Sequence, residues 1–120
     1  MQKLSWLLPA LLFVQTTLIW AQKSTVYTHE SARFDKAVSL YQDAQYASAQ
    51  LIFEKLVQNT TLEELKSDCA FYRADCAIKN NQPLAGILMS QFVSDYPTSI
   101  KQNQANLALA HYYYRSEEYS

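Results

Sequence analysis

Apolar residues recur at helical spacing from residue 34 onward, and the first such stretch organises the rest of the chain. One predicted helix carries apolar residues at i, i+3, i+4 and i+7, which form a single face: Phe34, Ala37, Val38 and Tyr41. After a short polar segment the spacing returns in Ala49, Ile52, Phe53, Leu56 and Val57. The pattern predicts two short antiparallel helices, with the small Ala49 where they cross.

A third helix is predicted over residues 62–78. Its apolar stripe is Leu62, Leu65, Cys69, Tyr72 and Cys76, and further alanines widen it. Thr61 and Glu64 have the spacing of a capping box, in which each side chain bonds the other residue's backbone N–H. We therefore expect Thr61 to cap a helix that begins at Leu62 and packs on two sides.

Two more helices are predicted in the last third of the chain. Pro83 is expected at the first position of the fourth helix, and Tyr96-Pro97 should end it. Ser99 and Gln102 predict a cap for the fifth helix. Its expected face comprises Ile100, Leu107, Ala110, His111 and Tyr114. We expect part of its apolar surface to be uncovered, drawn from Leu107, Leu109, Tyr112 and Tyr113.

Residues 1–21 are predicted to be a cleaved signal peptide. Lys3 precedes an apolar core over 4–14, and a peptidase could cut after Ala21 to leave Gln22 as the new N-terminus. An uncleaved membrane anchor is the alternative. No cysteine follows the apolar run, so a lipid anchor is not expected. Residues 22–33 are interpreted as a linker, and the protein is expected to be periplasmic or secreted.

Composition favours an all-α fold and excludes one class of partner. The 120 residues include 1 Gly and 3 Pro, too few for many tight hairpins. Hydrophobic residues make up 49% and charged residues 18%, which is a globular composition. The net charge of −1 comes without a basic stripe, which argues against nucleic-acid binding.

Alanine and tyrosine recur with a fixed period. Ala37 is followed 37 positions later by Ala74 and 36 positions after that by Ala110. Tyr46 recurs 73 positions on as Tyr119. A period in the mid-thirties with two helices per period is typical of a helical repeat.

These residues resemble the tetratricopeptide (TPR) family. The resemblance lies in Tyr46 to Ala49, Phe53 and Leu56, and in Ala85 with Pro97 twelve positions later. A register one residue later would place Gly86 in the position of Ala85. The segment 92–99, with Ala110 and Tyr112 to Tyr114, resembles repeats of bacterial periplasmic proteins in outer-membrane assembly and cell-envelope coordination.

The resemblance implies antiparallel helix pairs stacked as an α-solenoid over residues 34–120. It implies about two and a half repeats, with the array truncated at its C-terminal end. The residues expected to pack as the repeat signature are Ala37, Tyr46, Ala49, Phe53, Ala74, Ala85, Pro97, Ala110 and Tyr119.

No catalytic constellation is evident. Cys69 and Cys76 lie seven residues apart on one predicted helix, about 10 Å, which is too far for a disulfide. The two histidines, His29 and His111, have no nucleophile or metal-ligand spacing around them. We therefore expect no enzyme activity, no cofactor, no metal and no small-molecule substrate.

The predicted function is that of an exported TPR scaffold for protein–protein interactions in the bacterial cell envelope. The alternative is the N-terminal docking or regulatory part of a longer envelope enzyme. Partners are expected to be proteins or peptides, with self-association through the fifth helix possible. The residues expected at the binding surface are Tyr72, Tyr112 and Tyr113.

Overall fold

The computed structural model describes residues 29–118, which form five helices and no strand. This confirms the prediction of an all-α chain. The first helix covers residues 29–42, and the others are α2 (Tyr46–Asn59), α3 (Glu63–Lys79), α4 (Ala85–Asp95) and α5 (Gln102–Glu118). The predictions for residues 1–21, for most of the linker and for Tyr119 lie outside the described residues.

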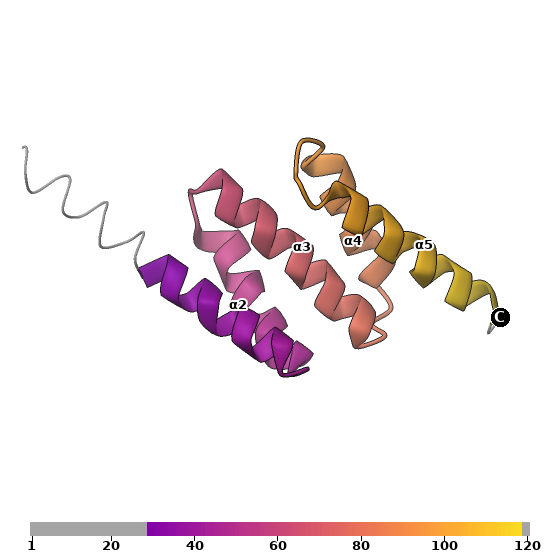
Figure 1. The fold of residues 1–120 in the computed structure, drawn as a ribbon, viewed down its shortest axis with the longest axis horizontal. Helices are drawn as coiled ribbons and strands as arrows, with labels where there is room; N and C mark the ends of the chain where they lie inside the picture. The colour runs from indigo at the N-terminus through magenta and orange to yellow at the C-terminus, as the bar shows by residue number, and fades with distance from the viewer. Residues whose placement is uncertain (1–28, 119–120) are drawn as a thin grey trace, which may run out of the picture. The chain divides into compact units, whose positions relative to one another are not determined.

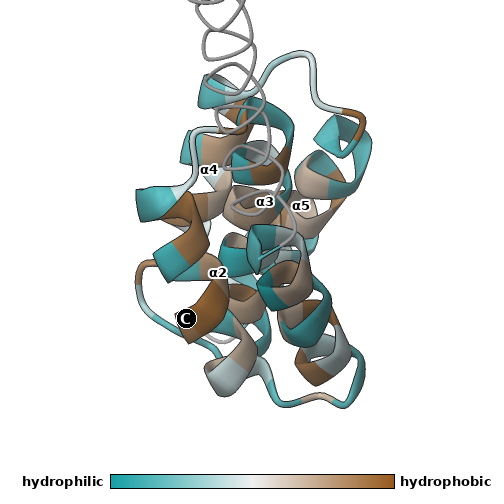
Figure 2. Cartoon of the chain, turned by 90° about the vertical axis from the view of Figure 1, so that its left-hand side faces the viewer, coloured by the Kyte–Doolittle hydropathy of each residue, from teal (hydrophilic) through white to brown (hydrophobic). Residues whose placement is uncertain are grey.

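Arg33–Ser120 form one compact unit, which contains most of helix 29–42 and the four helices that follow it. Within it each helix packs against the next, and α3 also contacts α5. Helix 29–42, α3 and α5 form one layer, which we call the first-helix layer, and α2 and α4 lie behind it (Figure 1). Figure 2 shows the two layers from the side, with hydrophilic and hydrophobic segments alternating along the helices.

Two apolar clusters hold these helices together, and α3 contributes to both. The first cluster joins helix 29–42, α2 and α3 through Ala37, Ala49, Phe53, Leu56, Cys69 and Cys76. The second joins α3, α4 and α5, and its largest buried side chains are Phe71, Ile78, Met89 and Phe92. The predicted packing of α3 on two sides is thus confirmed, because its apolar residues cover most of its circumference.

The turns after helix 29–42 and after α3 have the same geometry, 37 residues apart. Ala44 and Asn81 both adopt positive φ, at 59° and 54°. The Gln45 N–H donates to the Leu40 carbonyl at 2.9 Å, and the Gln82 N–H donates to the Ala77 carbonyl at 3.0 Å. These are the long hydrogen bonds of Schellman motifs, which end a helix on one left-handed residue.

Replacing Ala44 with glycine should raise the free energy of unfolding by about 0.5–1 kcal/mol. The left-handed conformation is strained for alanine, and glycine removes that strain at some cost in unfolded-state entropy. Chemical denaturation measures the change. Ala47→Gly, in the exposed first turn of α2, is the matched control and should lower stability instead. Destabilisation by both substitutions would contradict the strain at Ala44.

The capping box predicted at Thr61 and Glu64 is wrong. Helix α3 begins one residue later than predicted, at Glu63, and its N-cap residue Leu62 makes no side-chain cap bond. The buried Thr60, which comes just before Thr61, supplies a hydrogen bond instead. Its hydroxyl accepts from the Leu62 N–H at 3.2 Å. The chain stays extended at Thr60 as it leaves α2, which places Thr61 outside the helix.

Two other boundary predictions are also corrected. Pro83 precedes α4 by two residues, because a turn closed by the Ala85 N–H and the Gln82 carbonyl, at 3.1 Å, comes first. The Ser99 hydroxyl accepts from the Lys101 N–H at 3.2 Å. Gln102 does not reach back to Ser99, since its amide donates to the carbonyls of Val93 and Tyr96 at 3.0 and 2.7 Å. Helix α4 does end before Tyr96-Pro97, as predicted.

The face of α5 that meets the core is not the predicted one. Ala105 is buried, and the partly buried residues packed against the core beside it are Ala108, Leu109 and Tyr112. Leu107 is 61% exposed and Tyr114 is 69% exposed. Tyr112 packs over Gly86, where a β-carbon would lie 2.6 Å from its Cε1 atom. Glycine at residue 86 thus allows α5 to approach α4 closely.

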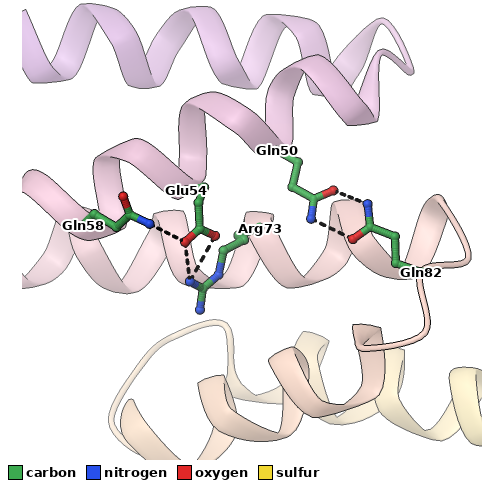
Figure 3. Close-up of polar contacts among 5 residues, drawn as sticks. All are labelled: Gln50, Glu54, Gln58, Arg73 and Gln82. Carbon is green, nitrogen blue, oxygen red and sulfur yellow. Dashed lines mark hydrogen bonds and ion pairs between the residues drawn. The ribbon is translucent and has the colours of Figure 1, made fainter.

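Polar side chains also join α2 to the second helix pair (Figure 3). Gln50 and Gln82 exchange two hydrogen bonds of 2.9 Å, which connects α2 to the turn before α4. Arg73 of α3 donates to both carboxylate oxygens of Glu54, at 3.3 and 3.2 Å. Gln58 donates to the same carboxylate at 3.0 Å. These contacts fix how far α3 can slide along α2.

Candidate interaction groove

A groove of about 550 Å³ follows the first-helix layer. Helix 29–42 contributes Tyr41, the turn before α5 contributes Lys101, and α3 and α5 supply the rest of the lining. The α5 residues in it recur at helical spacing and share one face: Gln104, Leu107, Ala108, His111 and Arg115. We call this hollow the first-helix groove.

A row of aromatic rings runs from α3 across helix 29–42 to the first residue of α2. The ring centroids of Phe71 and Tyr72 are 5.5 Å apart, those of Tyr72 and Tyr41 are 5.1 Å apart, and those of Tyr41 and Tyr46 are 5.5 Å apart. Phe53, which is fully buried, stacks on Tyr72 with centroids 5.0 Å apart. The groove is therefore anchored in the first apolar cluster.

Lysine ammonium groups lie over both ends of this row. Lys101 Nζ is 4.9 Å from the ring centroid of Tyr72 and 5.2 Å from that of Phe71. Lys79 Nζ is 5.5 Å from the ring of Tyr46 and 5.8 Å from that of Tyr41. Electrostatic attraction to the ring faces holds both cations at these positions without cancelling their charge.

One carboxylate, Asp75, lies in the groove and is buried. It accepts a hydrogen bond from the Tyr41 hydroxyl, and Lys79 Nζ is 3.8 Å from its Oδ2 atom. Burial, together with the Asp75 hydrogen bond, raises the pKa of Tyr41 well above its usual range. The Tyr41 hydroxyl thus stays protonated and acts as a hydrogen-bond donor at neutral pH.

Cys76, the next residue, is also buried. Its thiol should make the stability of the folded protein depend on pH in the alkaline range. Burial and the neighbouring Asp75 raise the pKa of its thiol from 9.0 to about 12. The folded protein then holds this proton more tightly than the unfolded chain does. The resulting stabilisation is complete below the unfolded pKa of 9.0 and is lost as the pH rises towards about 12.

We expect the melting temperature to fall across this alkaline range, and to fall less steeply in Cys76→Ala than in the wild type. Differential scanning calorimetry over a series of pH values measures both slopes. The comparison of slopes separates titration of the thiol from the loss of packing, which lowers the variant's melting temperature at every pH. Parallel curves would contradict the assignment to Cys76.

The three tyrosines predicted at the binding surface do not lie together. Tyr72 lines the first-helix groove. Tyr112 packs over α4 and lines a separate hollow with Pro83 and Arg115. Tyr113 is 50% exposed, and its ring centroid is 5.5 Å from that of Tyr112. The placement follows from the helix faces, because residue 112 points to the core and residue 113 is turned away from it.

The predicted repeat-signature residues occupy several environments. The fully buried ones are Ala37, Ala49, Phe53, Ala74 and Ala85. Tyr46 is partly buried, and Pro97 and Ala110 are exposed. Cys69 and Cys76 are not joined in a disulfide, and both are buried in the first cluster.

The polar residues of the groove were not found from the sequence. Asp75, Lys79 and Lys101 look like ordinary solvated positions on amphipathic helices. One signal could have revealed Asp75: at the 36–37-residue spacing of the recurring alanines, it aligns with Val38 and His111. A charged residue aligned with an apolar one at a groove position indicates a special role.

A second hollow, of about 570 Å³, is acidic. Its carboxylates are Glu63, Glu64, Asp68 and Asp95, and burial raises the pKa of Asp68. Within residues 29–118 no group of three or more His, Cys, Asp or Glu side chains is placed to hold a metal ion. None of the helices in this part of the chain has the length and apolar character needed to cross a membrane.

No protein-family model, curated protein or solved structure matches the chain.

Proposed function

We propose that the chain is an exported, TPR-like scaffold that binds other proteins in the bacterial cell envelope through its first-helix groove. The observation that carries this proposal is the groove itself, which is lined by the first helix of each successive helix pair. Stacked helix pairs of this kind present their first helices on one concave surface. Aromatic rings and fixed cations on that surface suit a peptide segment better than a small metabolite.

Repeated geometry supports the solenoid arrangement. The Schellman turns at Ala44 and Asn81 lie one period apart. Ala37 and Ala74, also one period apart, are both fully buried. Two consecutive helix pairs therefore share the same turn geometry and the same small buried residue. This recurrence is what a stack of equivalent units requires.

Export follows from the proposed signal peptide over residues 1–21. Mass spectrometry of the protein recovered from its native cells should find a chain beginning at or near Gln22. An intact Met1 on membrane-bound protein would favour the anchor instead, and the proposed export would fail.

Site-specific photocross-linking tests the proposed binding surface. A photoreactive phenylalanine analogue at Leu107, which lines the groove, should give discrete cross-linked adducts with other proteins in the cells that make the chain. The same analogue at Leu51 of α2, which is 67% exposed and lies outside the groove, is the control. Equal adducts at the two positions, or adducts only at Leu51, would overturn the groove as the binding surface.

A further inference from the structure

The charges in the first-helix groove indicate the chemistry of its partner. Three cationic side chains, Lys79, Lys101 and Arg115, line it together with a single carboxylate, Asp75, which leaves an excess of two positive charges. The whole chain has a net charge of −1. Positive charge is thus concentrated at this surface against the sign of the molecule.

Two of these cations are available to a ligand. Asp75 is already engaged by the Tyr41 hydroxyl and by Lys79. Among residues 29–118, neither Lys101 nor Arg115 lies within ion-pair distance of a carboxylate. Lys101 interacts with the Asp68 carboxylate only through longer-range electrostatics. The rings of Tyr72 and Phe71 hold the Lys101 ammonium at the groove without neutralising it.

Apolar surface lies beside these cations. Leu107 and Ala108 come from α5 and Ile78 from α3, and all three line the groove. Leu107 is 61% exposed, so its side chain is open to a ligand. A ligand that complements this lining carries both negative charge and an apolar group.

We propose that the groove takes an acidic segment of a partner protein. Aspartate or glutamate side chains of that segment pair with Lys101 and Arg115, and an apolar side chain of the segment lies against Leu107 and Ala108. The inference rests on the proposed function and adds to it the class of partner. Charge complementarity of this kind sets specificity and speeds association.

Selection from a random peptide library tests the inference. The full 120-residue chain is the bait, and the peptides carry amidated C-termini so that only side chains supply carboxylates. The selected peptides should be enriched in aspartate and glutamate and depleted of lysine and arginine. Binding of a fluorescent copy of a selected peptide should weaken as salt is added.

Two double variants separate the groove cations from general charge. Lys101→Gln with Arg115→Gln should weaken binding of the selected peptide about three- to tenfold, as expected for partly exposed charge pairs. Lys36→Gln with Lys55→Gln removes the same charge from exposed lysines outside the groove, and it should change binding less than about twofold. Equal weakening by both double variants would overturn the proposal.

A third variant, Gln104→Trp, blocks the groove. It separates the question of whether peptides bind in the groove from the question of whether the partner is acidic. Neutral or basic selected peptides that this variant no longer binds would overturn the acidic partner but leave the groove as a binding site. Selected peptides unaffected by the block would overturn both. A single-stranded oligonucleotide bound as tightly as the peptides would show a general polyanion surface, which also overturns the acidic partner.

Discussion

Replacing Phe53 with alanine should lower the free energy of unfolding by about 3–5 kcal/mol, the range for a large buried aromatic side chain. Phe53 is fully buried where helix 29–42, α2 and α3 meet. Its ring stacks on Tyr72 and makes an edge contact with Phe34 at 5.9 Å between centroids. The substitution therefore leaves a cavity directly beneath the aromatic row of the groove.

Urea unfolding of the wild type and the variant measures this loss. Leu51→Ala, on the exposed side of the same helix, is the control and should change stability by no more than about 0.5 kcal/mol. A loss of that small size for Phe53→Ala would place Phe53 outside the core and contradict the packing of the first cluster.

Replacing Ala74 with leucine should destabilise the protein by about 1–3 kcal/mol, because extra methylene groups have no room in a packed core. Ala74 is fully buried in the second cluster. Ala110 lies 36 residues later on α5 and is exposed, so Ala110→Leu is the matched control. That substitution should change stability by no more than about 0.5 kcal/mol.

Thermal and denaturant unfolding of the two leucine variants give the comparison. Equal effects at residues 74 and 110 would contradict the difference in burial between these two alanines. Improved stability of Ala74→Leu would reveal unfilled space between α3 and α4.

The helical periodicity of the sequence was enough to predict the all-α class. It also placed Phe53 and Ala49 in the core, because a stripe such as the one in residues 49–57 has only one way to become buried. The ends of the helices were less predictable. Thr61 and Pro83 are good helix starters in isolation, but the Thr60 hydroxyl, which accepts from the Leu62 N–H, and the turn between Gln82 and Ala85 set the first turns elsewhere.

Helix α5 shows a second limit of sequence patterns. Its sequence offers two apolar stripes, one through Leu107 and Ala110 and one through Ala105 and Leu109. Periodicity alone does not say which of them meets α4. The close approach of Tyr112 to Gly86 decides which face of α5 turns towards α4. The apolar spacing within α5 alone does not predict a contact with a residue of another helix.

The candidate site was predicted only in part. Tyr72 was expected at the binding surface, and it does line the groove. The cations Lys79 and Lys101 were not predicted, since a lysine on a helix usually marks a solvated face. Their position over aromatic rings depends on residues from neighbouring helices, which a linear pattern does not bring together.

The surface that binds a partner is tested most directly by nuclear magnetic resonance. Amide spectra of the isotope-labelled 120-residue chain, titrated with a library-selected peptide, report which residues sense the ligand. We predict the largest shifts at groove residues such as Tyr72, Lys101, Gln104 and Leu107. The largest shifts on the outer surface of α2 and α4, for example at Leu51 and Ile87, would contradict the first-helix groove as the binding site.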